Sequence, residues 1–333
     1  MPLITFTPKG LYCEKADVYI DPWRKVNKAL ITHAHADHAR KGHEAYLSHH
    51  HGVEILKLRL GKINIQGIEY GHTLDINGVT ISFHPAGHVV GSAMIKLEDK
   101  YESWVISGDY KLAEDNLSAP WEPVICDHFV TESTFGLPVY QWEDPEIIFE
   151  DINQWWQQNR EQGRPSVMTA YSLGKAQRII KNVNSEIGPI IAHHTIEKIN
   201  TRVRAEGLTL PPTLALPDAS AEDISTALIL CPSRSLETKW AAPIIKPLIG
   251  VASGWMALRG TRKRRQMDKG FVLSDHADWP ALNQAVELSE AENIYVTHGY
   301  EGIYSKYLNG EGYKAQAVKT LFEGEKLEEP VSS

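Results

Sequence analysis

The chain has 333 residues, with 34 Lys or Arg against 42 Asp or Glu, so its formal net charge is −8. Its 42% hydrophobic and 23% charged residues are typical of a globular protein and exclude collagen-like, disordered and disulfide-scaffold classes. The acidic balance also argues mildly against a protein coated in nucleic acid, which usually carries a basic excess.

The length predicts two domains, since a domain takes roughly 150 residues. Cys13, Cys126 and Cys231 lie far apart and form no CxxC pair, which favours a reducing, cytoplasmic setting. The N-terminal segment lacks the basic and apolar regions of a secretory signal. No stretch approaches the ~18 consecutive apolar residues of a membrane span, so we expect no membrane partner.

The first third of the chain is predicted to form short strands broken by Gly, Asn, Asp and Pro. The Asn77-Gly78 pair between two of these strands predicts a tight hairpin. The candidate strands are 18–20, 29–32, 62–65, 79–85, 93–97, 104–107 and 128–131.

From Pro145 the pattern changes to alternating helices and strands. Helices are predicted at 146–162, 173–183 and 195–206, and strands at 166–170, 189–192 and 226–231. Such alternation predicts a parallel sheet with helices on its faces. After a polar run, the predicted elements are a strand at 271–274, a helix at 279–288, a strand at 293–297, a helix at 303–309 and a frayed tail.

A cluster of metal-ligand types, His33-Ala34-His35-Ala36-Asp37-His38, directly follows a predicted strand. Side chains at i and i+2 of an extended segment share a side, so His33 and His35 can bind one ion together. Asp37 and His38 are expected at the start of a helix, where they could hold a second ion. Imidazole and carboxylate ligands suit Zn, Mn or Fe. A polar loop with chance histidines is the alternative, which four ligand types at this spacing disfavour.

Further ligand types recur at the ends of other predicted strands. His88 lies in a Gly-rich turn, Asp109 follows a strand and His298 follows another. A carboxylate can bridge two metals, whereas a neutral imidazole cannot. Each residue alone is weak evidence, but their recurrence beside the first cluster indicates a metal centre.

These motifs resemble the metallo-β-lactamase superfamily, which implies an αββα sandwich. The resemblance implies that His33, His35 and His88 hold one metal. It assigns the other metal to Asp37 and His38, with Asp109 bridging the two. Asp21 matches the family's first motif and is expected to support the metal loop through hydrogen bonds, although a simple turn before Pro22 would explain it equally well.

The second half resembles the β-CASP nucleases at three further motifs, which contain Glu132, His276 and His298. This resemblance implies that His298 joins the second metal site. It implies that His276 faces the scissile phosphate, with Glu132 orienting it and Asp37 also catalytic. The expected organisation is a metallo-β-lactamase domain at 1–137, a β-CASP-like α/β insert at 138–264 and a return segment at 265–333.

Over nearly the whole chain, the sequence is most similar to the bacterial ligase-associated DNA exonucleases. That resemblance implies hydrolysis with two divalent ions, Zn or Mn, that releases 5'-phosphates from DNA in the 5' to 3' direction during DNA repair. It also implies an ATP-dependent DNA ligase and a helicase as partners. His298 departs from this pattern, because an RNA-processing member typically has histidine there whereas the Artemis-like DNA repair members carry an aliphatic residue. An RNA endo- or exonuclease is therefore the alternative.

Two segments are predicted to contact nucleic acid. The run 259–269 carries six basic residues and one acidic residue and could neutralise several phosphates, although a solvated helix face is the alternative. Lys175 and Arg178 open a helix whose N-terminus could bind a phosphate, and Ser274 precedes the His276 motif. The predicted contacts in the basic run are Arg259, Arg262, Lys263, Arg264 and Arg265.

The run His49-His50-His51 is interpreted as a surface loop, with adventitious metal binding possible there. Two other functions remain open. A small-molecule esterase or thioesterase would share the superfamily fold, but the insert and the basic run speak against it. A catalytically inactive scaffold would have lost metal ligands, and all seven candidates are present here.

Overall fold

The structure is a computed structural model that describes residues 2–258 and 267–322. The chain divides into two compact units. Unit 1 contains the chain up to Glu114, the stretch Ser118–Gln141 and the segment that begins at His276. Unit 2 contains Asp115–Leu117 and Trp142–Asp275. The secondary structure is mixed α/β, as predicted.

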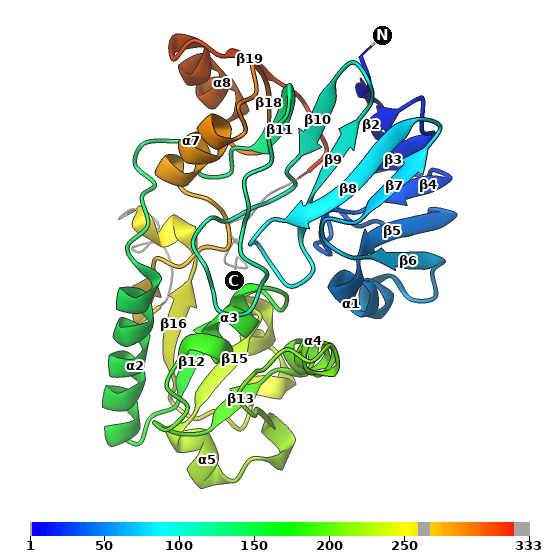
Figure 1. Ribbon diagram of the computed structural model, residues 1–333. Helices are drawn as coiled ribbons and strands as arrows, with labels where there is room; N and C mark the ends of the chain where they lie inside the picture. Colours follow the sequence, from blue (N-terminus) through cyan, green and yellow to red (C-terminus); the bar gives the residue numbers. More distant parts are fainter. Residues whose placement is uncertain (1, 259–266, 323–333) are drawn as a thin grey trace. The chain divides into compact units, whose positions relative to one another are not determined.

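The first sheet of unit 1 has the strand order β1-β2-β3-β4-β5-β6 (Figure 1). The pairs from β1 to β3 are antiparallel and the pairs from β3 to β6 are parallel. The strands are β1 (Thr5–Thr7), β2 (Gly10–Cys13), β3 (Val18–Ile20), β4 (Lys28–Leu30), β5 (Ala45–His49) and β6 (Ile65–Ile68).

The second sheet of unit 1 has the order β19-β18-β11-β10-β9-β8-β7. β7 to β10 pair antiparallel, whereas β10, β11, β18 and β19 are parallel to one another. The carboxyl ends of β10, β11 and β18 therefore share one edge of the sheet. The strands are β7 (Thr73–Ile76), β8 (Val79–Pro85), β9 (Ala93–Glu98), β10 (Ser103–Ile106), β11 (His128–Glu132), β18 (Asn293–Thr297) and β19 (Lys314–Ala317).

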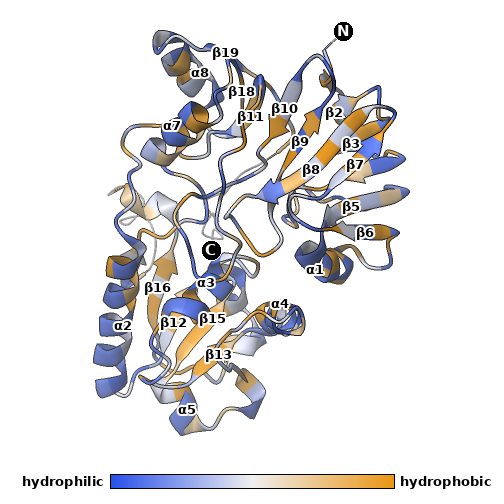
Figure 2. Ribbon diagram, in the orientation of Figure 1, coloured by the Kyte–Doolittle hydropathy of each residue, from blue (hydrophilic) through white to orange (hydrophobic). Residues whose placement is uncertain are grey.

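One apolar core joins the two sheets of unit 1. It combines Leu11 and Ile20 of the first sheet with Ile81, Phe83 and Ile95 of the second. A second core lies on the other face of the second sheet, against α7 (Trp279–Leu288) and α8 (Glu301–Gly310). α1 (His50–Leu60) packs against β5 and β6. In Figure 2, orange hydrophobic stretches accordingly run along β8 and β9.

The predicted hairpin joins β7 and β8. Ile76 pairs with Val79, and the two residues between them have positive φ angles, 55° at Asn77 and 73° at Gly78. Two left-handed central residues define a type I′ turn, for which Asn-Gly is the favoured sequence. The hairpin prediction is therefore confirmed.

Unit 2 is built on a parallel sheet, as the alternating pattern predicted. Its order is β14-β13-β15-β12-β16-β17, and every described pair is parallel. Its strands are β12 (Ser166–Thr169), β13 (Ile190–Ala192), β14 (Leu214–Ala215), β15 (Leu228–Cys231), β16 (Leu248–Ala252) and β17 (Lys269–Phe271). Its helices are α2 (Pro145–Glu161), α3 (Lys175–Asn182), α4 (His194–Ala205) and α5 (Ala221–Thr226), with 3₁₀ turns η1 (Leu216–Asp218), η2 (Ser233–Glu237), η3 (Lys239–Ala241) and η4 (Gly254–Ala257).

Some elements were predicted at the wrong residues, and others were not predicted at all. The strand predicted at 62–65 lies at Ile65–Ile68, and β1, β2, β5 and α1 were not predicted. β19, which pairs with β18, was not predicted either. The Glu/Lys-rich tail that was expected to fray lies outside the described residues. The histidine run is not a loop, because His49 ends β5 and the next two histidines open α1. β1, β2 and β6 have only three or four residues each, so they carry little periodic signal.

A close backbone contact holds α1 against the loop that contains His88. A Cβ atom on Gly91 would lie 2.4 Å from the backbone nitrogen of Gly52. Gly91 also has a positive φ of 77°. The contact therefore needs glycine for space as well as for conformation.

We expect Gly91→Ala to destabilise unit 1 more than the matched control Gly71→Ala. Gly71 has a similar φ of 74°, but a Cβ atom there would meet nothing within 4 Å, so both substitutions carry the left-handed cost of about 1–2 kcal/mol. Only Gly91→Ala adds a backbone clash, which costs about 1–3 kcal/mol more. Urea unfolding of the two variants measures the difference, and equal losses of stability would contradict the close contact.

Candidate metal centre

The buried carboxylate of Asp21 organises the loop that follows β4. Its Oδ1 accepts a hydrogen bond from the Thr32 backbone N–H at 2.8 Å, and its Oδ2 accepts one from the Thr32 hydroxyl at 2.5 Å. Oδ2 also lies 2.7 Å from Nδ1 of His38. Because Asp21 occupies Nδ1, the Nε2 atom of His38 is left to face the centre.

The loop itself is a turn rather than the start of a helix, which corrects the expectation for Asp37 and His38. A single backbone hydrogen bond, from Ala39 N–H to His35 O at 2.9 Å, closes the turn. Arg59 of α1 donates a hydrogen bond to Ala34 O and braces the same loop. Burial lowers the pKa of the Arg59 guanidinium, and the carboxylate of Asp37 opposes that shift.

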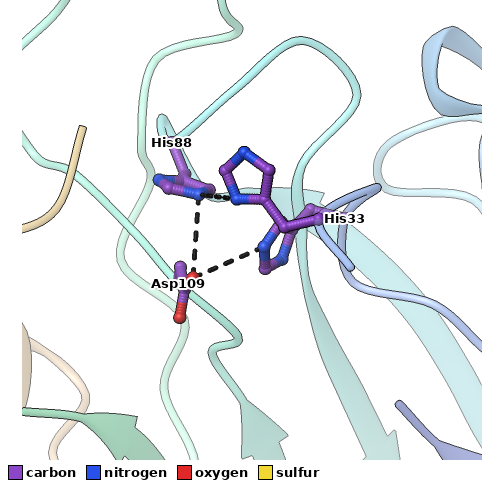
Figure 3. Close-up of side chains that lie close together, drawn as sticks. His33, His88 and Asp109 are labelled. Atoms are coloured by element: carbon purple, nitrogen blue, oxygen red, sulfur yellow. Dashed lines mark hydrogen bonds and ion pairs between the residues drawn. The ribbon is translucent and has the colours of Figure 1, made fainter. Parts of the chain in front are cut away.

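One cluster brings together His33, His35, His88 and Asp109. Figure 3 shows three of them, His33, His88 and Asp109, facing one another. Asp109 Oδ2 lies 3.4 Å from His33 Nε2 and 3.7 Å from His88 Nε2. His88 Nε2 lies 3.0 Å from His35 Nδ1. Ligand atoms at ~2.0–2.2 Å from a shared ion are separated by such distances.

A second cluster brings together Asp37, His38 and His298. The Nε2 atoms of the two histidines lie 3.6 Å and 3.9 Å from Asp37 Oδ2. The same atoms lie 3.5 Å and 3.8 Å from Asp109 Oδ1. Asp109 therefore presents one oxygen to each cluster, which is the arrangement of a bridging carboxylate.

Asp109 follows β10 and is placed by Gly108. A Cβ atom on Gly108, which has a φ of 56°, would lie 2.6 Å from Oγ1 of Thr32. The chain can therefore pass Thr32 closely only with glycine before Asp109. Burial favours the protonated form of Asp109, but the neighbouring imidazoles, His38 first, hold the pKa of its carboxyl well below the usual value.

Several polar atoms of the two clusters are buried without a hydrogen-bond partner among the described residues. They are Nε2 of His33, Nε2 of His38, Nε2 of His298 and Oδ1 of Asp109. Buried polar atoms are normally paired, so such a group needs an explanation. A cation in each cluster would satisfy these four atoms. The imidazole and carboxylate ligands fit Zn or Mn.

The imidazoles of the two clusters differ in the direction of their pKa shifts. Burial lowers the pKa of His33 to about 3, and it also lowers the pKa of His88 well below its ordinary value. Burial acts in the same direction on His38, but the carboxylates of Asp109, Asp37 and Asp21 outweigh it and raise the pKa of His38. His33 and His88 are thus neutral at pH 7, which is the form that binds a metal.

Glu132 and His276 form a pair beside the first cluster. The Glu132 carboxylate at the end of β11 accepts a hydrogen bond from Tyr110 N–H at 2.9 Å and lies 2.9 Å from Nδ1 of His276. The His276 ring centre is 4.8 Å from that of His88. Asp109, Glu132 and His276 also offer ligand atoms close to one another.

His298 is placed by the neighbouring strand β11. Its φ is 56°, a left-handed value, and the Ser133 hydroxyl donates a hydrogen bond to Thr297 O at 3.1 Å. Thr297 Oγ1 lies 3.1 Å from Nδ1 of His298. As with Asp21 and His38, a partner on Nδ1 leaves Nε2 for the centre.

Sequence reasoning missed residues that shape this centre. The Phe322 ring stacks on His38 at 4.4 Å and on His298 at 4.8 Å between ring centres. It follows the last predicted element, the helix at 303–309, and no sequence signal marked it. Arg59 was missed because α1 was missed.

The residues predicted to contact nucleic acid are not all described. Arg259, Arg262, Lys263, Arg264 and Arg265 lie outside the described residues. Lys175 and Arg178 are buried in unit 2, where Arg178 Nη1 donates a hydrogen bond to Ser274 O at 2.5 Å and lies 3.7 Å from Asp275 Oδ1. Their contact with nucleic acid stays a prediction.

Comparisons with known proteins identify relatives of this chain. A "Probable DNA ligase" from Opitutus terrae is 27% identical over 93% of the chain, which covers 30% of that protein. "Endoribonuclease YSH1" from Candida glabrata and "Cleavage and polyadenylation specificity factor 73" from Drosophila melanogaster are 30% and 31% identical over 35% of the chain, which covers 15% and 17% of their lengths. The resemblance to the β-CASP nucleases is confirmed. The chain spans less than a third of the length of these relatives.

The fold also resembles a solved structure. A protein of unknown function from Enterococcus faecalis V583 superposes with a TM-score of 0.61 at 11% sequence identity, over 89% of this chain and 80% of that one. No protein-family model matches the sequence. Among the described residues, no helix is long and apolar enough to cross a membrane.

We expect Asp21→Asn to weaken metal binding by about 10–100-fold while the protein stays folded, because an amide cannot accept from Thr32 and His38 as a carboxylate does. Metal content after dialysis against buffered Zn²⁺ or Mn²⁺ measures the loss. Asp17→Asn is the matched control, since Asp17 is an exposed residue with its own positive φ of 52°. Unchanged metal content in Asp21→Asn would contradict the supporting role of the carboxylate.

Proposed function

We propose that this protein is a metal-dependent DNA exonuclease that hydrolyses phosphodiester bonds and releases 5'-phosphates in the 5' to 3' direction, acting in DNA repair. The observation that carries the proposal is the position of Asp109, with one carboxylate oxygen toward each of two histidine-containing clusters. Two-metal centres of this kind are typical of phosphodiester hydrolysis. The residues assigned to the two ions are His33, His35, His88, Asp37, His38, His298 and the bridging Asp109.

The proposal extends to the fold. The two-sheet core of unit 1, with α1 beside one sheet and α7 and α8 against the other, supports the αββα sandwich of the metallo-β-lactamase superfamily. The parallel sheet of unit 2 supports a β-CASP-like insert, expected at residues 138–264. On this assignment the return segment is expected at residues 265–333, and unit 1 resumes within it at His276.

The residues of the chain have distinct tasks in this reaction. When bound, two divalent ions would lower the pKa of the attacking water and offset charge on the phosphoryl oxygens. Glu132 holds Nδ1 of His276, so Nε2 is the ring atom that can donate a proton to the phosphate or to the leaving 3' oxygen. Thr32 Oγ1 lies 3.1 Å from Nδ1 of His33 and Asp21 Oδ2 lies 2.7 Å from Nδ1 of His38, so these two residues hold the rings in place.

One relative supports DNA as the substrate, and other relatives support RNA. The ligase name of the Opitutus terrae protein, matched over 93% of the chain, supports DNA as the substrate. The endoribonuclease name of the YSH1 proteins and the presence of His298 in the second cluster favour RNA as the alternative. An ATP-dependent DNA ligase and a helicase remain the proposed partners.

We expect single-stranded DNA to be shortened from its 5' end and matched RNA to be cut more slowly. DNA and RNA of one sequence, labelled at the 5' or the 3' end, are incubated with Zn²⁺, Mn²⁺ or Mg²⁺ and resolved as product ladders. Asp37→Ala, with its metal content measured, is the inactive control. Faster cleavage of RNA would select the RNA nuclease, and full activity in Asp37→Ala would reject the two-metal reaction.

We expect His276→Ala to lower kcat by about 10²–10⁴-fold with little loss of metal, the range for a positioned proton donor. Glu132→Gln should lower kcat less, and the double variant should be no slower than His276→Ala, because Glu132 acts through His276. Kinetics and metal analysis of the three variants measure this. Equal losses of metal and rate in His276→Ala would make His276 a metal ligand instead.

A further inference from the structure

The histidine run lies outside the centre described above. His49 is the last residue of β5, and His50 and His51 are the first two of α1. The three rings converge, with ring centres 4.3 Å, 3.9 Å and 5.1 Å apart. Their ligand atoms all lie within 4.8 Å of one another.

His49 is the buried member of this group. The residue is 1% exposed, and its ring stacks on Tyr70 with ring centres 3.5 Å apart. Neither of its ring nitrogens has a hydrogen-bond partner among the residues that the structure describes. It precedes α1 but makes no side-chain capping hydrogen bond. A buried imidazole with two unsatisfied nitrogens has a cost that a ligand would remove.

The pairing of β5 with β6 brings the carboxylate of Glu69 close to these histidines. His49 pairs with Ile68 in the parallel ladder of β5 and β6, so Glu69 follows directly beside the start of α1. Glu69 Oε2 lies 3.0 Å from Nδ1 of His50. That nitrogen is buried and makes no hydrogen bond among the described residues, so its contact with Glu69 is an ion pair when His50 is protonated. When His50 is neutral, the same two atoms are close enough to bind one ion together.

We propose that His49, His50, His51 and Glu69 form a third divalent-cation site, suited to Zn²⁺ and separate from the two-metal centre. Three imidazoles and one carboxylate fill the four positions of a tetrahedral zinc site. A site with all four positions filled by protein is structural, because it leaves no position for substrate or a reactive water.

The site would tie together three parts of unit 1. It would cross-link the end of β5, the start of α1 and the segment after β6. α1 also carries Arg59, which braces the metal loop at Ala34, and Gly52, whose backbone abuts Gly91 in the His88 loop. An ion at the start of α1 would therefore stabilise the helix on which two loops of the other centre rest.

The test is the number of Zn²⁺ ions that the tag-free full chain binds. Protein stripped with a chelator is dialysed against buffered Zn²⁺ alone and then desalted, and zinc and protein are measured by mass spectrometry and amino-acid analysis. We compare the wild type with His51→Ala, Glu69→Gln and the double variant, which change partly exposed side chains and spare buried His49. His72→Ala, at an exposed histidine close in sequence to Glu69, is the matched control.

We expect the double variant to bind one Zn²⁺ fewer per chain than the wild type and the control, and each single variant to bind that ion at least about tenfold more weakly. Thermal unfolding should show a smaller Zn²⁺-dependent rise in Tm for the double variant. Equal zinc content in the wild type and the double variant would overturn the proposal. Loss of the third ion from the wild type on desalting would also overturn it, since that indicates weak surface binding.

Discussion

The candidate metal centre depends on one buried carboxylate, that of Asp21. Asp21 joins the end of β3 to the loop after β4. Its backbone N–H donates a hydrogen bond to Leu30 O at 2.9 Å, and its carboxylate binds Thr32 and His38. Thr32 in turn is the group against which Gly108 packs, and Gly108 places Asp109. Loops from two sheets are thereby aligned through a short series of contacts that begins at a residue with no direct place in either cluster.

Electrostatics in the centre are balanced by reciprocal contacts. Burial disfavours the charged forms of Asp109 and His38. The imidazoles around Asp109 and the carboxylates around His38 offset this effect, so both side chains keep their charge. The net charge of −8 gave no hint of this arrangement, because it averages the whole sequence. The net charge of a whole chain therefore says little about whether one local site on it can bind nucleic acid.

The sequence predicted what short-range patterns encode. The Asn77-Gly78 turn, the alternation that produces the parallel sheet of unit 2 and the grouping of strand-end histidines were all readable, since each depends on local spacing. Phe322 and Arg59 were not, because they reach the centre only through tertiary packing. The histidine run was misread for the same reason: its burial comes from Tyr70 and from the partner strand β6, neither of which a run of three histidines reveals.

The insertion of β18 next to β11 has a consequence for the order in which the protein can assemble. His298 follows β18, and its strand neighbour β11 ends at Glu132. Unit 1 therefore cannot complete the second cluster until the stretch Trp142–Asp275 of unit 2 has been synthesised. Until then β11 is an open sheet edge, and Asp37 and His38 lack His298. The contacts that bring His298 to Asp37 and His38 thus have a large sequence separation, which makes them slow to form.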